Sequence, residues 1–225
     1  MPQYFAFEVA LLDVEPRIWR QFYLAVDDTT FLDLHAAIQD ADTWMDMHLW
    51  QFRDGRPGRV LAATPPDEEM GFDDIDSGPP ADEVALTDVF ENAGQACLYL
   101  YDFGDGWEHE VVLKQIVELP ETFYRRLVSG ERAFPPEDCG GLPGYEFCVA
   151  LTKPDAESPI DFSDWDAEEI EERRDWIGDW DPEEFNLKGA KEWFDGDSRR
   201  ELAEKQEAIL DELDDDMDQF ESDEE

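Results

Sequence analysis

The sequence has little of several things that common protein classes require. Its three cysteines, a low and odd number, do not supply a disulfide framework, which argues against a small secreted scaffold. No apolar run approaches the roughly 20 residues of a membrane-spanning helix, and the first residues lack the basic and apolar regions of a signal peptide. We therefore expect a protein of the reducing cytoplasm that makes no membrane contact.

Basic residues are also scarce. The chain has 17 Lys and Arg against 60 Asp and Glu, and its formal net charge is −43. The densest basic groups are small: Arg53, Arg56 and Arg59 in one stretch, the Arg125–Arg126 pair and the Arg199–Arg200 pair. Phosphate binding needs a basic patch or stripe. Direct binding of duplex DNA is therefore disfavoured by the charge, and the expected partner is an unidentified protein, peptide or nucleic acid.

The acidic excess covers the whole chain rather than one tail. Residues 195–225 hold 15 acids and three bases, so most of the excess lies before them. Only five of the basic residues are lysines. In molar salt the Debye length falls to about 3 Å and repulsion between acids is screened. An acid-coated, lysine-poor surface therefore suggests a salt-adapted source, with an ordinary acidic protein as the alternative.

The chain nevertheless has the material for a packed core. It is 42% hydrophobic and 13% aromatic, with eight Trp and 15 Phe, which is not the composition of a disordered chain. Its 225 residues fit one domain with an appendage or two small domains. We expect an α+β domain over residues 1–192 and an acidic, helical or disordered extension over 193–225.

Strand patterns come first and helix patterns later. Aromatic and β-branched runs predict strands at 4–12, 18–24, 48–52, 96–103 and 107–117. Helix patterns begin at Thr30 with Asp33 as its capping partner, cover 120–130, start near Tyr145, cover 163–178, start at Asp181 and cover the acidic stretch 198–220. The stretch 53–83 is predicted as a loop. This order indicates a single α+β domain, an antiparallel β-sheet packed by helices, plus a C-terminal acidic helix.

The stretch 101-YDFGDGWEHEVVLK-114 carries more polar and aromatic residues than a turn requires. Asp105-Gly106 between two strands is a strong hairpin signal. A two-residue turn would place Asp102 opposite His109, where the carboxylate could orient the imidazole. A three-residue loop would instead place Tyr101 opposite His109. The predicted pairing therefore depends on the turn type.

The three histidines of the chain are His35, His48 and His109, and each falls in an expected helix or strand. With Asp102 and Cys139, which lies in a Gly-rich loop, they could form a His/Cys/Asp site. Burial of each histidine in the core is the competing interpretation. No local ligand spacing such as Cys-x-x-Cys is present to decide between the two.

Several stretches in order carry a resemblance to a known family: LLDVEPRIWRQF, FLDLHAAIQDADTWMDMHLWQF, LYDFGDGWEHEVVL, GERAFPPEDCGGLPGYE and WIGDWDPEEFNL. From about residue 3 to about residue 190, the chain closely resembles the plasmid pRiA4b ORF-3-like family, some members of which are called insertion-sequence passenger or TnpR-like proteins. The resemblance implies a compact α+β domain and a link to mobile DNA, but no particular reaction. The family's recurring polar positions correspond here to His35, Gln39, Trp44, His48, Tyr101, Asp102, Asp105, Trp107, Glu108, His109, Glu137, Asp138 and Cys139. Many members have a cysteine where this chain has Phe134, so a two-cysteine metal clip is not expected.

Two functions follow from these residues. The first is a non-enzymatic module that binds its partner through an aromatic, polar cleft built from Trp44, Trp50, Tyr101 and Trp107; the binding candidates are Trp44, His48, Tyr101, Asp105, Trp107 and Glu108. The second is a hydrolase or metal-dependent enzyme in which His109 is base or ligand and Asp102 orients it. Its further catalytic candidate is Cys139, and the candidate ligands for a divalent metal are His35, His48 and His109. The sequence favours the first function, because no complete catalytic motif is present.

Overall fold

The structure is a computed structural model that describes residues 1–41, 44–64, 78–153, 160, 162 and 165–195. The strands are β1 (Gln3–Leu11), β2 (Trp19–Ala25), β3 (Trp50–Arg53), β4 (Val60–Ala63), β5 (Ala96–Tyr101), β6 (Trp107–Glu118) and β7 (Arg125–Glu131). The helices are α1 (Phe31–Asp40), α2 (Gly141–Thr152), α3 (Ala167–Ile177) and α4 (Leu187–Phe194), with a short 3₁₀ turn, η1 (Leu86–Asp88).

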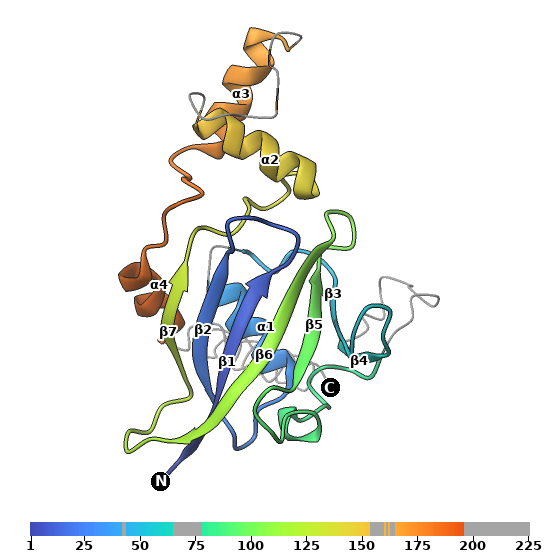
Figure 1. The fold of residues 1–225 in the computed structure, drawn as a ribbon, viewed down its shortest axis with the longest axis vertical. Helices are drawn as coiled ribbons and strands as arrows, with labels where there is room; N and C mark the ends of the chain where they lie inside the picture. Colours follow the sequence, from blue (N-terminus) through green and yellow to red (C-terminus); the bar gives the residue numbers. More distant parts are fainter. Residues whose placement is uncertain (42–43, 65–77, 154–159, 161, 163–164, 196–225) are drawn as a thin grey trace, which may run out of the picture.

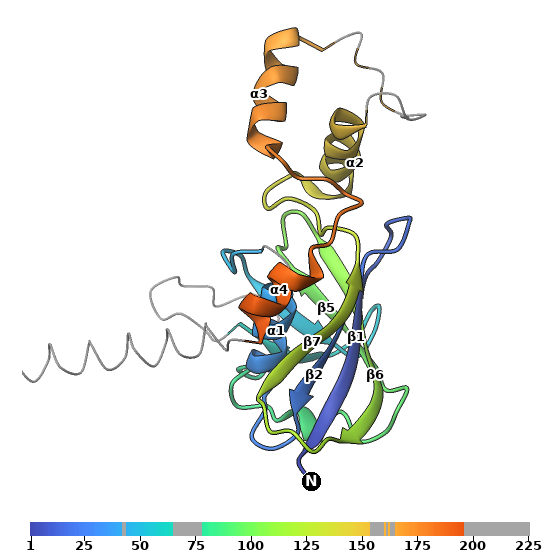
Figure 2. The same cartoon turned by 90° about the vertical axis from the view of Figure 1, so that its left-hand side faces the viewer.

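The described strands form one antiparallel sheet of seven strands in the order β4-β3-β5-β6-β1-β2-β7. Helices α1 and α4 lie on one face of this sheet, whereas α2 and α3 project beyond one of its ends (Figure 1, Figure 2). The predicted α+β fold with an antiparallel sheet packed by helices is therefore confirmed. The predicted acidic helix over 198–220 lies outside the described residues.

The core lies between the sheet and α1. Strand β1 lies inside the sheet between β6 and β2 and is buried along almost its whole length. Its residues Phe5 and Phe7 point to the same face of the sheet. Phe7 contacts Phe90 edge-on at 4.9 Å, and Phe31 of α1 contacts Phe52 of β3 at 5.0 Å. Each fully buried phenylalanine stabilises the fold by about 2–3 kcal/mol relative to exposure, so this aromatic layer fixes α1 against the sheet.

Helix α1 begins where the sequence predicts. Asp33 Oδ2 accepts a hydrogen bond from the backbone N–H of Thr30 at 2.8 Å, which satisfies one of the free donors of the first turn. The residues spaced three and four apart, Phe31, Leu34, His35 and Ile38, are all buried. The predicted apolar face of this helix, with His35 on it, is confirmed.

Two helix predictions are wrong. The stretch 120–130 contains β7 instead, in which Leu127 pairs with Phe22 of β2. In β7 the backbone hydrogen-bonds to the edge of β2, whereas a short isolated helix is only marginally stable. The pairing with β2 therefore overrides the local helix signals here. Asp181 caps a turn only, accepting from the backbone N–H of Glu183 at 2.9 Å, and α4 starts later with Asn186 as its cap.

Other boundaries differ in smaller ways. Strand β4 lies within 53–83, which was predicted as loop, and β3 begins at Trp50 rather than at His48. Helix α3 agrees with the sequence, because Asp166 caps it and Gly178 follows its last residue. Helix α4 continues to Phe194, which is fully buried against Phe22, so the packed body extends just past residue 192.

The hairpin between β5 and β6 is confirmed, but neither predicted register is present. Tyr101 pairs with Trp107, and Tyr99 pairs with His109, which leaves 102–106 as the loop. Asp102 ends β5 with a left-handed backbone, φ 53°, and its Oδ1 accepts from the N–H of Gly104 at 2.8 Å. The loop closes when Gly106 N–H donates to the carbonyl of Asp102 at 2.7 Å. This local bonding by Asp102 makes the loop longer than an Asp-Gly turn.

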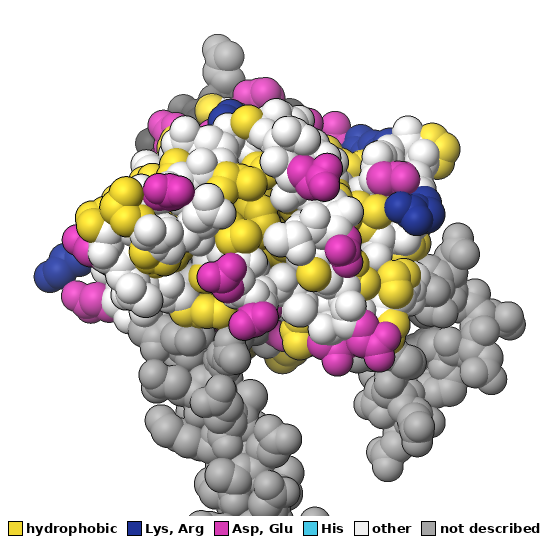
Figure 3. All heavy atoms as spheres, turned by 90° about the horizontal axis from the view of Figure 1, so that it is seen from below, with side chains coloured by type: hydrophobic (Ala, Val, Ile, Leu, Met, Phe, Trp, Pro, Cys, Tyr) yellow, Lys and Arg dark blue, Asp and Glu magenta, His cyan; other side chains and the backbone are white. Residues whose placement is uncertain are grey.

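At the end of the molecule opposite α2 and α3, the surface shows the excess of acidic over basic residues that the composition gives (Figure 3). Figure 3 shows acidic side chains scattered between apolar ones on this end, with few basic side chains among them. The acidic residues are spread out rather than gathered in one patch. The described residues that Figure 3 shows do not form a broad basic patch.

Candidate metal centre

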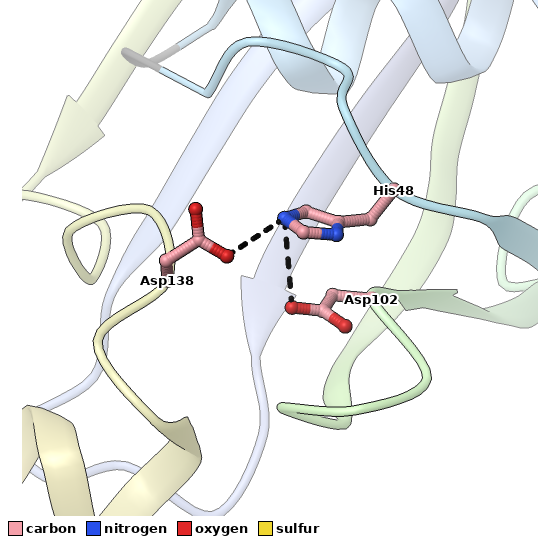
Figure 4. Close-up of side chains that lie close together, drawn as sticks. All are labelled: His48, Asp102 and Asp138. Atoms are coloured by element: carbon pink, nitrogen blue, oxygen red, sulfur yellow. Dashed lines mark ion pairs between the residues drawn. The ribbon is translucent and has the colours of Figure 1, made fainter.

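Three segments far apart in the sequence bring ligand-forming side chains together at one end of the sheet (Figure 4). His48 comes from the segment before β3, Asp102 from the loop after β5 and Asp138 from the loop before α2. The Nε2 atom of His48 lies 3.1 Å from Oδ1 of Asp138 and 3.8 Å from Oδ2 of Asp102. Glu137 adds a third carboxylate, with its Oε1 3.6 Å from the same nitrogen.

The distances from Nε2 of His48 to Asp138 and Glu137 match the spacing of ligand atoms around one metal ion, and the distance to Asp102 is slightly longer. Protein nitrogen and oxygen ligands bind Zn²⁺ at about 2.0–2.2 Å, which puts neighbouring ligand atoms about 3.0–3.6 Å apart. The chosen oxygen and nitrogen atoms of His48, Asp102 and Asp138 all lie within 4.8 Å of one another. Nε2 of His48 is buried and makes no hydrogen bond of good geometry within the described part of the chain. The geometry therefore suits a cation between these groups better than direct hydrogen bonding.

The backbone conformation of residues in and near this cluster is also consistent with a functional site here. Asp102 and Asp138 both have left-handed backbones, with φ 53° and φ 56°, and so does Asp46, with φ 56°. Non-glycine residues adopt this conformation infrequently, although aspartate does so more readily than most. Such conformations gather at functional sites, where surrounding structure holds them. Both aspartates of the cluster belong to this class, as do Asp13, Asp28 and Arg132 elsewhere in the described residues.

Glu137 is held firmly in place. Its Oε1 accepts from the hydroxyl of Tyr101 at 2.8 Å, and its Oε2 accepts from the backbone N–H of Met45 at 2.8 Å. Burial raises the pKa of Tyr101, and the hydrogen bond to Glu137 raises it further. The phenol therefore stays protonated and donates to the carboxylate.

The loop at 102–106 rests on the start of α2. Asp105 Oδ2 accepts from the backbone N–H of Gly140 at 3.0 Å. Gly141 has φ +68°, and a Cβ at that position would lie 2.8 Å from the carbonyl oxygen of Asp105. Only glycine fits both the backbone angle and the close approach. This contact fixes the distance between the loops that carry Asp102 and Asp138.

The other two histidines do not reach the cluster. His109 is fully buried among Trp44, Tyr99 and Phe134, with ring centroids 5.2–5.5 Å away. Burial lowers its pKa to about 3, although backbone groups of Tyr99 and Trp107 oppose the shift. His109 is therefore a neutral core residue, and the predicted pairing of Asp102 with His109 is replaced by one with His48.

His35 is a satisfied core histidine. Its ring stacks on Trp50 at 3.8 Å, its Nδ1 is 2.8 Å from the hydroxyl of Tyr99, and its Nε2 is 2.8 Å from Oδ1 of Asp46. Both ring nitrogens therefore have partners. Of the three predicted metal candidates, the structure places His48 alone in the carboxylate cluster.

Cys139 is next to the cluster in sequence, but its thiol is buried. Burial, together with the nearby Cys148 and Asp105, raises the pKa of Cys139 to about 12. A nucleophilic cysteine requires the thiolate, which these surroundings disfavour. The Sγ–H instead faces the carbonyl of Gly141 at 3.8 Å.

The aromatic binding candidates lie in the core rather than in a cleft. Trp44, Trp50, Tyr101 and Trp107 are each at most 5% exposed. Trp44 stacks on Tyr101 at 4.8 Å and donates its indole N–H to the carbonyl of Pro135 at 2.9 Å. These aromatic side chains pack between the sheet and the loops next to it, so they do not form an exposed surface for a partner. Among the polar candidates, Glu108 pairs with Arg56.

Sequence patterns alone singled out neither Glu137 nor Asp138. They stand in FPPEDCGG, where the prolines and glycines indicate a rigid loop but not its direction. The resemblance did include them among its recurring polar positions, and that was the available signal. Separately, no helix in the described ranges has both the length and the apolar character to cross a membrane.

Comparison with known proteins agrees with the fold and leaves the chemistry open. The chain is 37% identical over 161 residues to the uncharacterized protein y4hQ of Sinorhizobium fredii (strain NBRC 101917 / NGR234), covering 70% of this chain and 78% of that protein. It is also similar to the crystal structure of MM3350, a protein of unknown function from Methanosarcina mazei Go1, with TM-score 0.65 and 30% identity over 84% of this chain and 98% of that one. The family model described as plasmid pRiA4b ORF-3-like protein matches residues 3–189, and the chain belongs to this family.

Proposed function

We propose that this protein binds one divalent transition-metal ion through His48, Asp102 and Asp138 and uses it in a hydrolytic reaction. The observation that carries the proposal is the buried Nε2 of His48, which makes no good hydrogen bond and faces carboxylates from two other segments at 3.1–3.8 Å. Imidazole together with carboxylates suits Zn²⁺, Mn²⁺ or Fe²⁺, whereas Ca²⁺ and Mg²⁺ prefer oxygen ligands alone.

The ligand number supports a catalytic rather than a structural ion. Structural zinc sites are usually closed by four protein ligands, and catalytic sites keep a position for water. Three protein ligands leave that position free, and a bound ion would lower the pKa of water there toward about 7. Glu137, whose oxygens already accept from Tyr101 and Met45, keeps lone pairs that can accept a proton from that water.

The first test is direct metal binding. Titration of Zn²⁺ and Mn²⁺ into the full chain, in about 2 M KCl to suppress loose binding to acidic surface groups, should show one tight site. His48→Gln and Asp138→Asn should each weaken binding about 100-fold or more, since each removes a ligand.

The chain offers a matched control for Asp138. Asp13 is also an exposed aspartate with a left-handed backbone, φ 61°, but it pairs with Arg56. Asp13→Asn should therefore leave metal affinity unchanged within about twofold. A wild-type chain that takes up neither ion, or an Asp13→Asn change that weakens binding as much as Asp138→Asn, would remove the proposal.

The hydrolytic part needs its own measurement. The metal-loaded chain and the same chain after chelator treatment are compared on activated esters and phosphoesters. Turnover that requires the metal and is lost in His48→Gln supports hydrolysis. Tight binding without turnover on either class would leave a metal-binding protein and exclude this reaction class. The non-enzymatic binding module and the link to mobile DNA stay predictions.

We also propose that the protein is adapted to high salt, as the net charge of −43 suggests. Screening at high ionic strength reduces repulsion between acidic groups. The midpoint of urea unfolding should therefore rise strongly between about 0.1 M and 3 M KCl. Equal midpoints at the two salt concentrations would contradict salt adaptation without touching the metal proposal.

A further inference from the structure

The hydroxyl group of Tyr101 contacts two of the ligand-bearing segments at once. It donates to Oε1 of Glu137 at 2.8 Å, and Glu137 immediately precedes the ligand Asp138. It also accepts from the backbone N–H of Met47 at 3.2 Å, and Met47 immediately precedes the ligand His48.

The third segment is joined to the same residue by the chain itself. Tyr101 is the last residue of β5, and the ligand Asp102 follows it directly. The ring of Tyr101 is fully buried and stacks on Trp44 at 4.8 Å, so the position of its hydroxyl is fixed by the core. One phenol therefore adjoins all three segments from which the cluster is built.

We propose that Tyr101 is the positioning residue of the metal centre, and that its hydroxyl holds the three ligand segments at the spacing one ion needs. The inference rests on the proposed metal binding. Hydrogen bonds from outside the ligand shell orient ligands, and their loss typically weakens metal affinity 10- to 100-fold. A hydrogen bond to an ionised carboxylate, such as that of Glu137, is among the stronger ones in proteins.

Tyr99 provides a matched control two residues earlier on the same strand and the same face. It is also fully buried, and its ring lies 6.4 Å from that of Tyr101 with the planes within 12°. Its hydroxyl lies 2.8 Å from Nδ1 of His35 and accepts from Nε2 of Gln39 at 2.9 Å, and both of these partners belong to α1. Tyr99→Phe therefore removes the same atom from the same strand, and its partners His35 and Gln39 are linked to the His48 segment through Asp46, one step further away than the contacts of Tyr101.

The experiment titrates Zn²⁺ into the full-length wild type, Tyr101→Phe and Tyr99→Phe under the salt conditions above. Tyr101→Phe should raise the dissociation constant about 10- to 100-fold, whereas Tyr99→Phe should change it less than about threefold. Urea unfolding of both variants should show that each is folded. In the metal-free state, backbone hydrogen exchange at Met45 and Met47 should be faster in Tyr101→Phe than in Tyr99→Phe.

The outcomes separate this inference from the proposal beneath it. A wild type that binds Zn²⁺ tightly, with Tyr101→Phe binding equally well, overturns the positioning role alone. Equal weakening in both variants also overturns it, because a general loss of stability then accounts for the change. A wild type that binds no Zn²⁺ overturns the metal centre and the role of Tyr101 together.

Discussion

Nε2 of His48 and Oδ1 of Asp138 lie 3.1 Å apart although neither residue belongs to a helix or a strand. Loops usually vary more in position than the elements they connect. Here each loop is tied to a neighbouring segment by a hydrogen bond: Met47 to the buried Tyr101, and Gly140 to the half-buried Asp105. Short ties of this kind give loop residues the precision that a metal site requires.

The packing of Gly141 predicts a linked loss of stability and affinity. A Cβ there would meet the carbonyl of Asp105 at 2.8 Å, and φ is +68°. Gly141→Ala should lower the free energy of unfolding by about 2–4 kcal/mol, from backbone strain plus overpacking. It should also weaken Zn²⁺ binding, because it pushes the loop of Asp102 away from that of Asp138.

Gly94 is a control that separates the effect of backbone strain from that of overpacking. It has φ +90°, but apart from its chain neighbours no atom of the described residues lies within 4 Å of a Cβ built on it. Gly94→Ala should cost about 1–2 kcal/mol of unfolding free energy from backbone strain alone, and it should leave Zn²⁺ affinity as in the wild type. Urea unfolding and zinc titration of both variants test this. Equal effects of the two variants on affinity would be inconsistent with the loop contact we describe.

His109 should make stability fall in acid. Its pKa is about 3 in the folded protein and near 6.5 when unfolded. Between these values the unfolded chain binds a proton that the folded chain does not, so this contribution is complete above about pH 6.5 and falls as the pH drops toward 3. The expected slope is about 1.4 kcal/mol per pH unit.

The variant His109→Phe keeps an aromatic ring between Trp44 and Phe134 but removes the titrating group. Urea unfolding of both proteins at pH 4, 5, 6 and 7 gives the difference in slope, in which the shared effect of the carboxylates cancels. The unfolding free energy of the variant should decline less steeply below pH 6. Parallel curves would show that His109 does not remain neutral in the folded state.

The buried pair of Asp40 and Arg125 should contribute far more than a neighbouring surface pair. The Asp40 carboxylate at the end of α1 lies 2.7 Å from Arg125 of β7 and accepts from the indole N–H of Trp193 at 3.1 Å. Asp40→Asn leaves the buried guanidinium without its counter-charge and should cost about 3–5 kcal/mol of unfolding free energy.

The adjacent pair of Arg126 and Glu121 is the control. Its atoms are 2.6 Å apart, but the side chains are 38% and 65% exposed. Glu121→Gln should therefore cost less than about 1 kcal/mol in the same urea experiment. Similar costs for Asp40→Asn and Glu121→Gln would mean that burial does not strengthen the first pair.

Metal removal should lower thermal stability by an amount that grows with the logarithm of the affinity. Binding to the folded state alone adds about 2.7 kcal/mol when free metal is 100 times the dissociation constant. Protons compete with metal for the imidazole and the carboxylates, so the thermal shift on adding Zn²⁺ should shrink as the pH falls. His48→Gln should show a much smaller shift than the wild type at every pH. Differential scanning calorimetry with Zn²⁺ and with chelator measures this, and a shift of wild-type size in His48→Gln would place the metal elsewhere.

The sequence predicts much of the fold because the relevant signals are local. The capping pair Thr30 and Asp33, the aromatic strands and the α+β class are all readable from period and turn chemistry. β7 was missed because its partner β2 lies about a hundred residues earlier, and non-local pairing leaves no mark on the helix-like stretch 120–130. The acidic stretch 198–220 lies outside the described residues.

The candidate site is harder to predict from the sequence than the fold, because it also depends on contacts that leave no local signal. The hairpin register was set by Asp102, whose side chain bonds to Gly104 and lengthens the loop. A shift of register changes every cross-strand partner, so His109 came to face Tyr99 and turned into the core. His48 stays a candidate ligand, and its nearest carboxylate neighbour, Asp138, comes from a loop whose direction depends on the packing of Gly141 against Asp105.

The position of β1 inside the sheet, between β6 and β2, determines when its strand edges are covered during synthesis. β1 pairs with β2 on one side, and its other side is closed only by β6 (Trp107–Glu118). During synthesis, the apolar hairpin of β1 and β2 therefore has two open edges, which close only when β6 and then β7 have emerged, after about half of the chain is made. Open strand edges pair readily with other chains. Every unfinished copy therefore presents both of these edges to its neighbours until β6 and β7 have been made.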